Sequence, residues 1–224
     1  MLRILGNRKR SCSGVTRRDA IAAGGLSLAA GLGLHPIGCA LIGLALAAAV
    51  TGALHEDGLA DVADGFGGGS DCNAKLKIMR DSRIGAFGVL ALIFSVGIRT
   101  TVLGGLIGAG LASAALVCAA VVSRAVLPMM MARMPMARSD GLAAAAGTPN
   151  DETAWTALVL GTVGSIVLLG LMSGLIVVAS ACITTVAVAW LSRRQIRGYT
   201  GDVLGAVQQA VETAVIVAAG ATAL

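Results

Sequence analysis

Long apolar stretches alternate with shorter polar ones along the chain. The apolar stretches cover residues 20–54, 84–131, 153–190 and 203–224. A helix needs about 20 apolar residues to cross roughly 30 Å of hydrocarbon, where backbone polar groups are satisfied only in helices or closed barrels. The pattern therefore predicts an all-α fold, a polytopic helical membrane bundle with about six to seven transmembrane segments.

Three of these stretches are too long for one ordinary crossing and are interrupted near the middle. His35-Pro36 interrupts residues 20–54, where a helix should end or kink because proline lacks the N–H of the helical ladder. Glycines between 104 and 110 interrupt the second stretch. The third would be about 57 Å long as one helix and is expected to turn near residues 170–174. The chain should therefore form successive hairpins, the first being two spans or a re-entrant pair, followed by one last span.

Composition agrees with a chain that lies mostly in lipid. Hydrophobic residues make up 56% of it and charged residues 13%, and the mean hydropathy is +0.86. The net charge of +5 does not indicate a nucleic-acid partner, because the basic residues flank apolar stretches as the positive-inside rule describes. The expected macromolecular environment is the lipid bilayer.

The hairpin arrangement gathers the basic residues on one face. That face holds 15 of the 17 Lys and Arg, whereas a single crossing over residues 20–54 would move four of them to the other side. The sequence therefore predicts a multi-pass protein of the cytoplasmic (inner) membrane whose basic face is cytoplasmic. The expected parts are a basic N-terminal segment, 1–19, one transmembrane catalytic domain, 20–224, a cytoplasmic active-site loop, 55–83, and the further cytoplasmic loops 132–152 and 191–202.

Three aspartates at the start of the loop 55–83 point to chemistry. Asp57, Asp61 and Asp64 recur at i, i+4 and i+7, which places them on one face of a helix. Like charges on one stripe repel and destabilise the helix. Mg²⁺ prefers carboxylate oxygens and keeps open coordination positions for phosphate oxygens. A magnesium site is therefore the first hypothesis, and a solvated acidic face is the alternative.

The residues after this stripe suit a phosphate ester. Glycines let the backbone approach a ligand closely, and cations neutralise phosphate charge. Asp202 brings another carboxylate to the same face, where it is either a site residue or the N-cap of the last helix. The glycines and charged residues that carry this interpretation are Gly67, Gly68, Lys75, Lys77, Arg80, Asp81 and Arg83.

Three charges lie within apolar stretches. Arg99, Arg124 and Glu212 would each cost at least about 2.5 kcal/mol if they faced lipid, so they are expected to point into the bundle. Counted by helical rise from the cytoplasmic ends, Arg124 and Glu212 lie at closer levels than Arg99. The sequence therefore predicts that Arg124 pairs with Glu212.

Three ordered motifs resemble those of the cobalamin-5′-phosphate synthase family. Residues 51–65 (TGALHEDGLADVADG) and 78–88 (IMRDSRIGAFG) are similar to its two signature stretches, and residues 200–206 (TGDVLGA) are similar to its C-terminal motif. The likeness runs from about Pro36 to Glu212. The first 34 residues differ from the family's usual beginning, Arg197 stands where glycine is common, and Gln209 replaces a frequent acid.

The resemblance implies a Mg²⁺-dependent transferase. Its substrates would be adenosylcobinamide-GDP and α-ribazole or α-ribazole 5′-phosphate, and its products adenosylcobalamin or its 5′-phosphate and GMP. By this resemblance Asp57, Asp61 and Asp64 would hold the metal together with Asp202. Asp81 would be a candidate for the residue that accepts the hydroxyl proton. The candidates for phosphate contacts are Lys75, Lys77, Arg80 and Arg83.

Two other classes of membrane protein share some of these features. A CDP-alcohol phosphotransferase would also place carboxylates at a membrane face, but its Asp-Gly-x-x-Ala-Arg pattern is absent, because Asp61 follows Ala60. An ion-coupled transporter would carry acids near the membrane midplane in broken helices, whereas eleven of the twelve acids here fall in polar stretches or at span ends. A homo-oligomer is compatible with the sequence.

Overall fold

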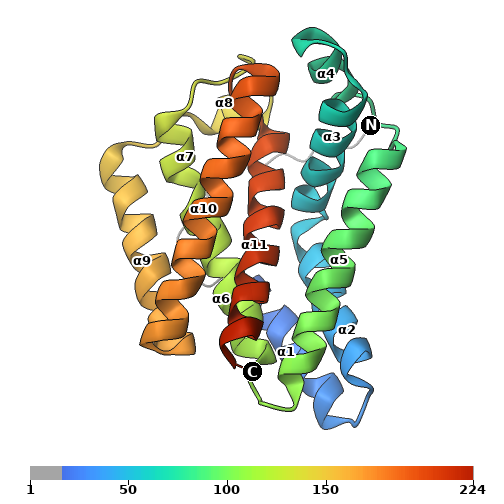
Figure 1. Cartoon of the computed structure of the whole chain (residues 1–224), viewed down its shortest axis with the longest axis vertical. Coiled ribbons are helices and arrows are strands. Elements are labelled where there is room, and N and C mark those ends of the chain that lie inside the picture. Colours follow the sequence, from blue (N-terminus) through green and yellow to red (C-terminus); the bar gives the residue numbers. More distant parts are fainter. Residues whose placement is uncertain (1–16, 224) are drawn as a thin grey trace.

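The computed structural model describes residues 17–223, and the regular structure in that range is helical (Figure 1). One isolated bridge, between Met136 and Tyr199, is its only extended pairing in this range. The predicted all-α fold is confirmed. The helices of the described range are α1 (Arg17–Gly31), α2 (Pro36–Thr51), α3 (Leu54–Gly68), α4 (Cys72–Ile78), α5 (Ala86–Ile107), α6 (Ala112–Ala125), α7 (Leu127–Arg133), α8 (Leu142–Ala146), α9 (Asp151–Leu169), α10 (Leu171–Ile196) and α11 (Gly201–Ala223).

Five helical segments are long and apolar enough to cross a membrane. They are α5, α6 continued by α7, α9, α10 and α11. The helices α2 and α3 meet at a bend of 91° and together count as a sixth, broken segment. The sequence predicted about six to seven segments. A count of six agrees with the lower end of this prediction, because α1 and α2, with 15 and 16 residues, are each shorter than an ordinary crossing.

The predicted hairpins are present. The helix α1 is followed by α2 after a turn in which His35 caps α2, its Nδ1 accepting from Ile37 N at 3.3 Å, and Pro36 is the first helical residue. The helices α5 and α6 turn at residues 108–111, and α9 and α10 turn at Gly170, whose φ of +83° favours glycine.

The polar stretches contain more helix than expected. Most of the predicted loop 55–83 is formed by α3 and α4, and α10 continues past Trp190 to Ile196, so the loop 191–202 shrinks to residues 197–200. In the basic segment 1–19, residues 1–16 lie outside the described residues, and Arg17 already begins α1.

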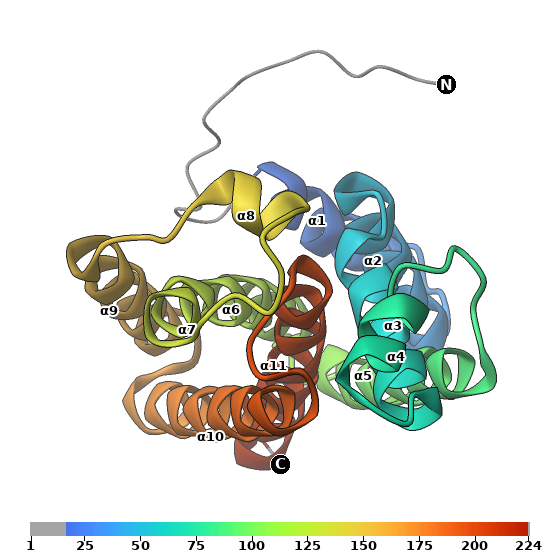
Figure 2. The ribbon, with the colours of Figure 1, turned by 90° about the horizontal axis from the view of Figure 1, so that it is seen from above.

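The last helix, α11, lies at the centre of the bundle. Seen from above, α10, α6 and the pair α3 and α5 surround it (Figure 2). Two glycines allow α3 and α11 to approach closely: a Cβ on Gly58 would lie 2.7 Å from the carbonyl oxygen of Asp202, and one on Gly205 would lie 3.3 Å from the Cα of Gly58. This contact brings the aspartates of α3 beside the start of α11.

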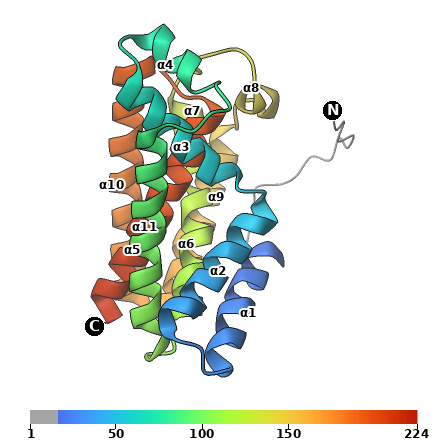
Figure 3. The same cartoon turned by 90° about the vertical axis from the view of Figure 1, so that its right-hand side faces the viewer.

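The polar connections gather at one end of the molecule. The helices α4 and α8 and the turn from α10 to α11 lie at that end, and the turns of the three hairpins lie at the other (Figures 1 and 3). The helix α3 continues upward from α2 along α5 (Figure 3). The sequence correctly predicted that the stretches 55–83, 132–152 and 191–202 share one end of the bundle.

The predicted pairing of Arg124 with Glu212 is wrong. Glu212 accepts from Arg99 at 2.7 Å, and Arg124 pairs with Asp19 of α1 at 3.3 Å. By helical rise from the ends of α5 and α11 at the polar end, Arg99 and Glu212 lie about 20 Å and 17 Å deep, a difference that an arginine side chain spans. The packing of α5 on α11 and of α1 on α6 decides the partners.

A carboxylate site at the polar end of the bundle

The helix α3 carries three of the predicted site residues. Its start is set by two consecutive residues in the left-handed region, Gly52 at φ +69° and Ala53 at φ +53°. A non-glycine residue seldom adopts this conformation. The turn ends α2 and redirects the chain by 91°, so that α3 rises along α5 and α11 toward the polar end (Figure 3).

Asp202 joins this group from the first turn of α11. The N-cap of α11 is Thr200, whose Oγ1 accepts from Val203 N at 3.3 Å and contacts Asp202 Oδ2 at 3.1 Å. Because Thr200 fills the capping position, the carboxylate of Asp202 is not needed for it. Of the two interpretations that the sequence left open for Asp202, the N-cap is filled by Thr200, and the role of Asp202 in the site stays a prediction.

Asp61 lies at the middle of the acidic group. Its carboxylate is partly buried and is repelled by the charges of Asp57, Asp202 and Asp64, while the charge of Arg138 opposes them. Like charges this close are unfavourable without a cation. The packing of α3 on the start of α11 thus places Asp57 and Asp61 near Asp202, and their role as metal ligands stays a prediction.

The carboxylate of Asp64 binds the start of α5. It is 9% exposed, and its two oxygens accept from Gly85 N at 2.7 Å and Gly88 N at 2.9 Å, at the start of α5. A carboxylate at a helix N-terminus satisfies backbone donors that have no partner within the helix. Neither glycine could carry a side chain without meeting Asp64. Asp64 thus anchors α3 to α5, and a role in metal binding stays a prediction.

The basic residues predicted to contact phosphate bind different side chains of the protein. Arg80 binds Asp140 at 2.5 and 2.7 Å, Arg83 binds Asp81 of the same turn, and Lys75 donates to Gln195 of α10. Hydrogen bonds from Arg83 hold the pKa of the half-exposed Asp81 carboxyl at about 2, so Asp81 is a weak base in this arrangement. Its role as proton acceptor, like the phosphate contacts of these cations and of the exposed Lys77, stays a prediction.

The glycines of the predicted loop belong to the end of α3. A Cβ on Gly67 would lie 2.7 Å from the ring of Phe87, and one on Gly68 would lie 3.5 Å from Ile78. Gly67 therefore allows α3 to pack closely on α5. Whether either glycine also approaches a ligand stays a prediction.

Sequence reasoning missed Arg138. This residue lies in the segment between α7 and α8, and its Nη2 donates to Asp202 Oδ2 at 3.1 Å. The surrounding backbone is tied to the turn before α11, because Ala137 N donates to Tyr199 O at 2.8 Å and Tyr199 N to Pro135 O at 3.0 Å. Only its location in a polar stretch on the predicted cytoplasmic face could have suggested it.

A buried polar chain continues from the site into the bundle. Gln209 donates to Glu56 at 3.0 Å and to Gln208 at 2.9 Å, and Gln208 donates to Ser123 at 3.1 Å and to Glu212. Glu212 in turn binds Arg99 at 2.7 Å. The amide groups join the carboxylate end of the molecule to the buried ion pair.

The side chains of the site are of the kind that binds Mg²⁺, but they are too few to fill its coordination positions by themselves. In residues 17–223 no three His, Cys, Asp or Glu side chains converge closely enough to hold a metal by themselves. Mg²⁺ is commonly bound through one or two carboxylates, with water and substrate phosphate oxygens filling the other positions. Asp57, Asp61 and Asp202 fit that requirement in donor type, because carboxylate oxygens are ligands that Mg²⁺ prefers.

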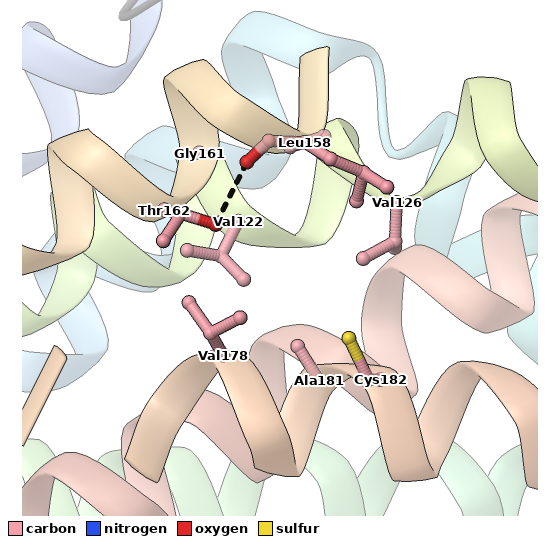
Figure 4. Close-up of a pocket in the computed structure, with 9 residues that line it drawn as sticks. Val122, Val126, Leu158, Gly161, Thr162, Val178, Ala181 and Cys182 are labelled. Atoms are coloured by element: carbon pink, nitrogen blue, oxygen red, sulfur yellow. Dashed lines mark hydrogen bonds between the residues drawn. The ribbon is translucent and has the colours of Figure 1, made fainter. Parts of the chain in front are cut away.

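Neither of two cavities in the bundle belongs to this site. One, of about 10 Å³, lies between α6, α9 and α10 and is lined by apolar side chains together with Thr162, whose hydroxyl donates to Leu158 O at 2.8 Å (Figure 4). It is large enough for about one water molecule. The other, of about 240 Å³, lies at the opposite end, near Leu106, Ser173 and Thr222. The carboxylate site is therefore formed where helices meet at the polar end.

Fold and site together define a polytopic helical membrane protein with a carboxylate site at one end of its bundle. Among such proteins, the chain belongs to the cobalamin-5-phosphate synthase family, whose model matches residues 20–220. The family assignment made from the three motifs is confirmed.

Curated relatives agree over most of the chain. The adenosylcobinamide-GDP ribazoletransferase of Bradyrhizobium diazoefficiens is 44% identical over 190 residues, which are 85% of this chain and 73% of the relative. The protein of the same name from Mesorhizobium japonicum is 46% identical over 84% of this chain and 72% of its own length. That from Azorhizobium caulinodans is 41% identical over 82% of this chain and 72% of its own. No solved structure shows significant similarity to the chain.

Proposed function

We propose that this protein is an adenosylcobinamide-GDP ribazoletransferase. The observation that carries the proposal is the packing of α3 on the start of α11, which places Asp57 and Asp61 near Asp202 within the part of the chain that matches the family. The relatives that bear this activity as their name share 41–46% of their residues with the chain over that part. The substrates are adenosylcobinamide-GDP and α-ribazole or its 5′-phosphate.

Asp57, Asp61 and Asp202 would hold Mg²⁺, which supplies positive charge to phosphate oxygens when bound. The protein's own part is to place the carboxylates without a full cage, so that substrate oxygens have room. Gly58 and Gly205 set this placement by letting α3 lie against α11. Asp64 fixes the rotation of α3 by holding the start of α5.

The reaction is a displacement at phosphorus. The 3′-hydroxyl oxygen of α-ribazole forms a bond to the cobinamide-side phosphorus, the bond from that phosphorus to the bridging oxygen breaks, and GMP leaves with the bridging oxygen and its electron pair. The hydroxyl proton passes to a carboxylate of the site. Catalysis of such a step rests on positioning and on compensation of charge at the phosphate oxygens. The cations at this end of the bundle attract the diphosphate to it.

The polar end of the bundle faces the cytoplasm in this proposal, because the basic residues gather there. The test uses single cysteines in a cysteine-free background, at Ser70→Cys and Ser139→Cys, two exposed serines of that end. Ser192, which is fully buried, is unsuitable. A membrane-impermeant thiol reagent should modify both variants in inverted vesicles and neither in intact cells. Labelling from outside would reverse the orientation.

The activity has a direct assay. The purified full chain is given adenosylcobinamide-GDP, α-ribazole 5′-phosphate and Mg²⁺, and GMP and adenosylcobalamin 5′-phosphate are measured. Chelation by EDTA should stop GMP release, and added Mg²⁺ should restore it. Folded protein that releases no GMP would refute the transferase assignment. Release that survives chelation would refute the metal alone.

A further inference from the structure

Arg138 contacts the carboxylate site directly. Its Nη2 donates to Asp202 Oδ2 at 3.1 Å, and its charge opposes those of Asp57 and Asp202 at Asp61. A second acid, Asp140, lies 3.8 Å from its Nε and is mostly exposed. Because one guanidinium faces several carboxylates, its presence leaves the site negative and still able to take a further cation.

The guanidinium has one nitrogen without a partner. Nη1 is buried and makes no hydrogen bond to the described residues, although the Arg138 side chain is 17% exposed. A buried donor without an acceptor carries a desolvation cost that is recovered when an acceptor arrives. The nitrogens of a guanidinium are arranged as a fork that matches the oxygens of a phosphate. The unpartnered Nη1 of Arg138 is therefore suited to donate a hydrogen bond to an anionic oxygen of a ligand.

The backbone holds Arg138 in place before any ligand arrives. The two hydrogen bonds that join residues 135–137 to Tyr199 fix its chain segment against the turn into α11. Gly198 is required for this approach, since a Cβ there would lie 2.8 Å from Ala137 N. Little backbone ordering remains to be done on binding, which favours affinity.

The other arginines of this end are differently placed. Arg80 donates to both oxygens of Asp140, and Arg83 is bound to Asp81, two residues away. Neither makes a hydrogen bond to Asp57, Asp61 or Asp202 among the described residues. Arg138 combines contact with the site and an unused donor.

We infer that Arg138 binds a phosphate of the diphosphate substrate beside the metal carboxylates, an inference that rests on the proposed transferase function. Its contact with Asp202 holds the guanidinium ready, and Nη1 donates to a phosphate oxygen when the diphosphate is bound. The segment between α7 and α8 thereby contributes to substrate recognition, in addition to α3 and α11.

The test compares Arg138→Ala and Arg138→Lys with a matched control, Arg133→Ala. Arg133 lies five residues earlier and forms an exposed ion pair with Asp151 at 3.3 Å. Inorganic pyrophosphate with Mg²⁺ is titrated calorimetrically into the full-length protein in detergent. Loss of a charged hydrogen bond should weaken pyrophosphate binding by at least about tenfold in Arg138→Ala. The weakening should be smaller in Arg138→Lys, which keeps the positive charge. Arg133→Ala should bind like the unaltered protein.

Kinetics supply the second measurement, with unphosphorylated α-ribazole as acceptor so that one substrate alone carries phosphate. In Arg138→Ala, kcat/KM for adenosylcobinamide-GDP should fall by roughly 10²-fold, while the KM for α-ribazole stays unchanged. Added guanidinium ion should restore part of the rate in this variant and not in Arg133→Ala. A residue that merely braces the loop would lower stability without altering pyrophosphate binding.

Each outcome decides the matter. Unaltered pyrophosphate affinity in folded Arg138→Ala overturns the inference, and so does a failure of the unaltered protein to bind pyrophosphate. If Arg138→Ala does not fold, the same comparison is made with Arg138→Gln, in which unchanged pyrophosphate affinity would also overturn the inference. If pyrophosphate binding depends on Arg138 but no GMP is released, the phosphate contact stands and the proposed function fails.

Discussion

The bundle contains two groups of charged residues: an inner group in which opposite charges are paired, and an outer group in which carboxylates gather. In the inner group, Arg99 and Glu212 are 3% and 7% exposed and form a pair at 2.7 Å, and Arg124 is paired with Asp19. In the outer group, Asp57 and Asp61 of α3 lie near Asp202, and Arg138 donates a hydrogen bond to Asp202 alone among these three. Both groups include a residue of α11, yet only in the inner group does each arginine have one acidic partner.

The difference separates structure from function. A buried charge is costly unless it is paired, and the inner pairs remove that cost within the protein. The outer carboxylates repel one another in the absence of a ligand. A site that is unfavourable by itself and becomes favourable with a cation and an anionic substrate is arranged for binding. The two groups should therefore respond to mutation in opposite ways.

The largest effect is expected in the inner group. Arg99→Met or Glu212→Met should each lower the free energy of unfolding by about 3–5 kcal/mol, because each leaves a buried charge without its partner. The double variant should lose much less than the sum, since both charges are then gone. Unfolding is measured in detergent, with the exposed Arg193→Ala as a control that should change little. Additive losses would mean that Arg99 and Glu212 are not partners.

The next effect tests the outer group. Asp57→Asn and Asp61→Asn keep the shape but remove an anionic ligand, so turnover should fall by roughly 10²-fold or more, equivalent to about 2.7 kcal/mol. Their stability should stay the same or increase as repulsion is relieved. Asp64→Asn should instead lose about 1–3 kcal/mol of stability, because its amide nitrogen cannot accept from the backbone of α5.

The measurements for these three variants are GMP release and the free energy of unfolding on the same preparations. Full activity in folded Asp57→Asn and Asp61→Asn would contradict the metal site. Unchanged stability in Asp64→Asn would mean that the capping of α5 contributes little, and would leave metal binding as the better account of Asp64.

The prolines and glycines that interrupt the apolar stretches predicted the hairpins, because a turn depends on the backbone preferences of the residues within it. Pro36 cannot continue a helix from the preceding residues, and Gly170 adopts a positive φ that other residues avoid. The spacing of Asp57, Asp61 and Asp64 likewise placed them correctly on one helix. Such features depend on neighbours along the chain, which a sequence displays directly.

Partners across helices could not be predicted in the same way. Helical rise gave the depth of Arg99, Arg124 and Glu212, but the direction in which each side chain points depends on how the helices are rotated against one another. Hydrophobic periodicity does not reveal that rotation in α2 or α9, because lipid as well as protein accepts apolar side chains. Arg138 was missed for a related reason: the bridge to Tyr199 that places it is non-local.

The smallest effect concerns the ion pair between Arg80, which follows α4, and Asp140 in the segment that carries Arg138. Arg80 and Asp140 are 54% and 63% exposed, and exposed ion pairs contribute about 0.2–1 kcal/mol, less at high salt. Arg80→Ala and Asp140→Asn should therefore each cost at most about that much stability. Both should change turnover by only a small factor, although Asp140→Asn also removes the longer contact of 3.8 Å with Arg138 Nε. Stability and turnover are measured for both variants at low and high salt. If Arg80→Ala lowers turnover strongly while Asp140→Asn does not, Arg80 binds phosphate as the sequence predicted, and its pair with Asp140 exists only until the substrate arrives.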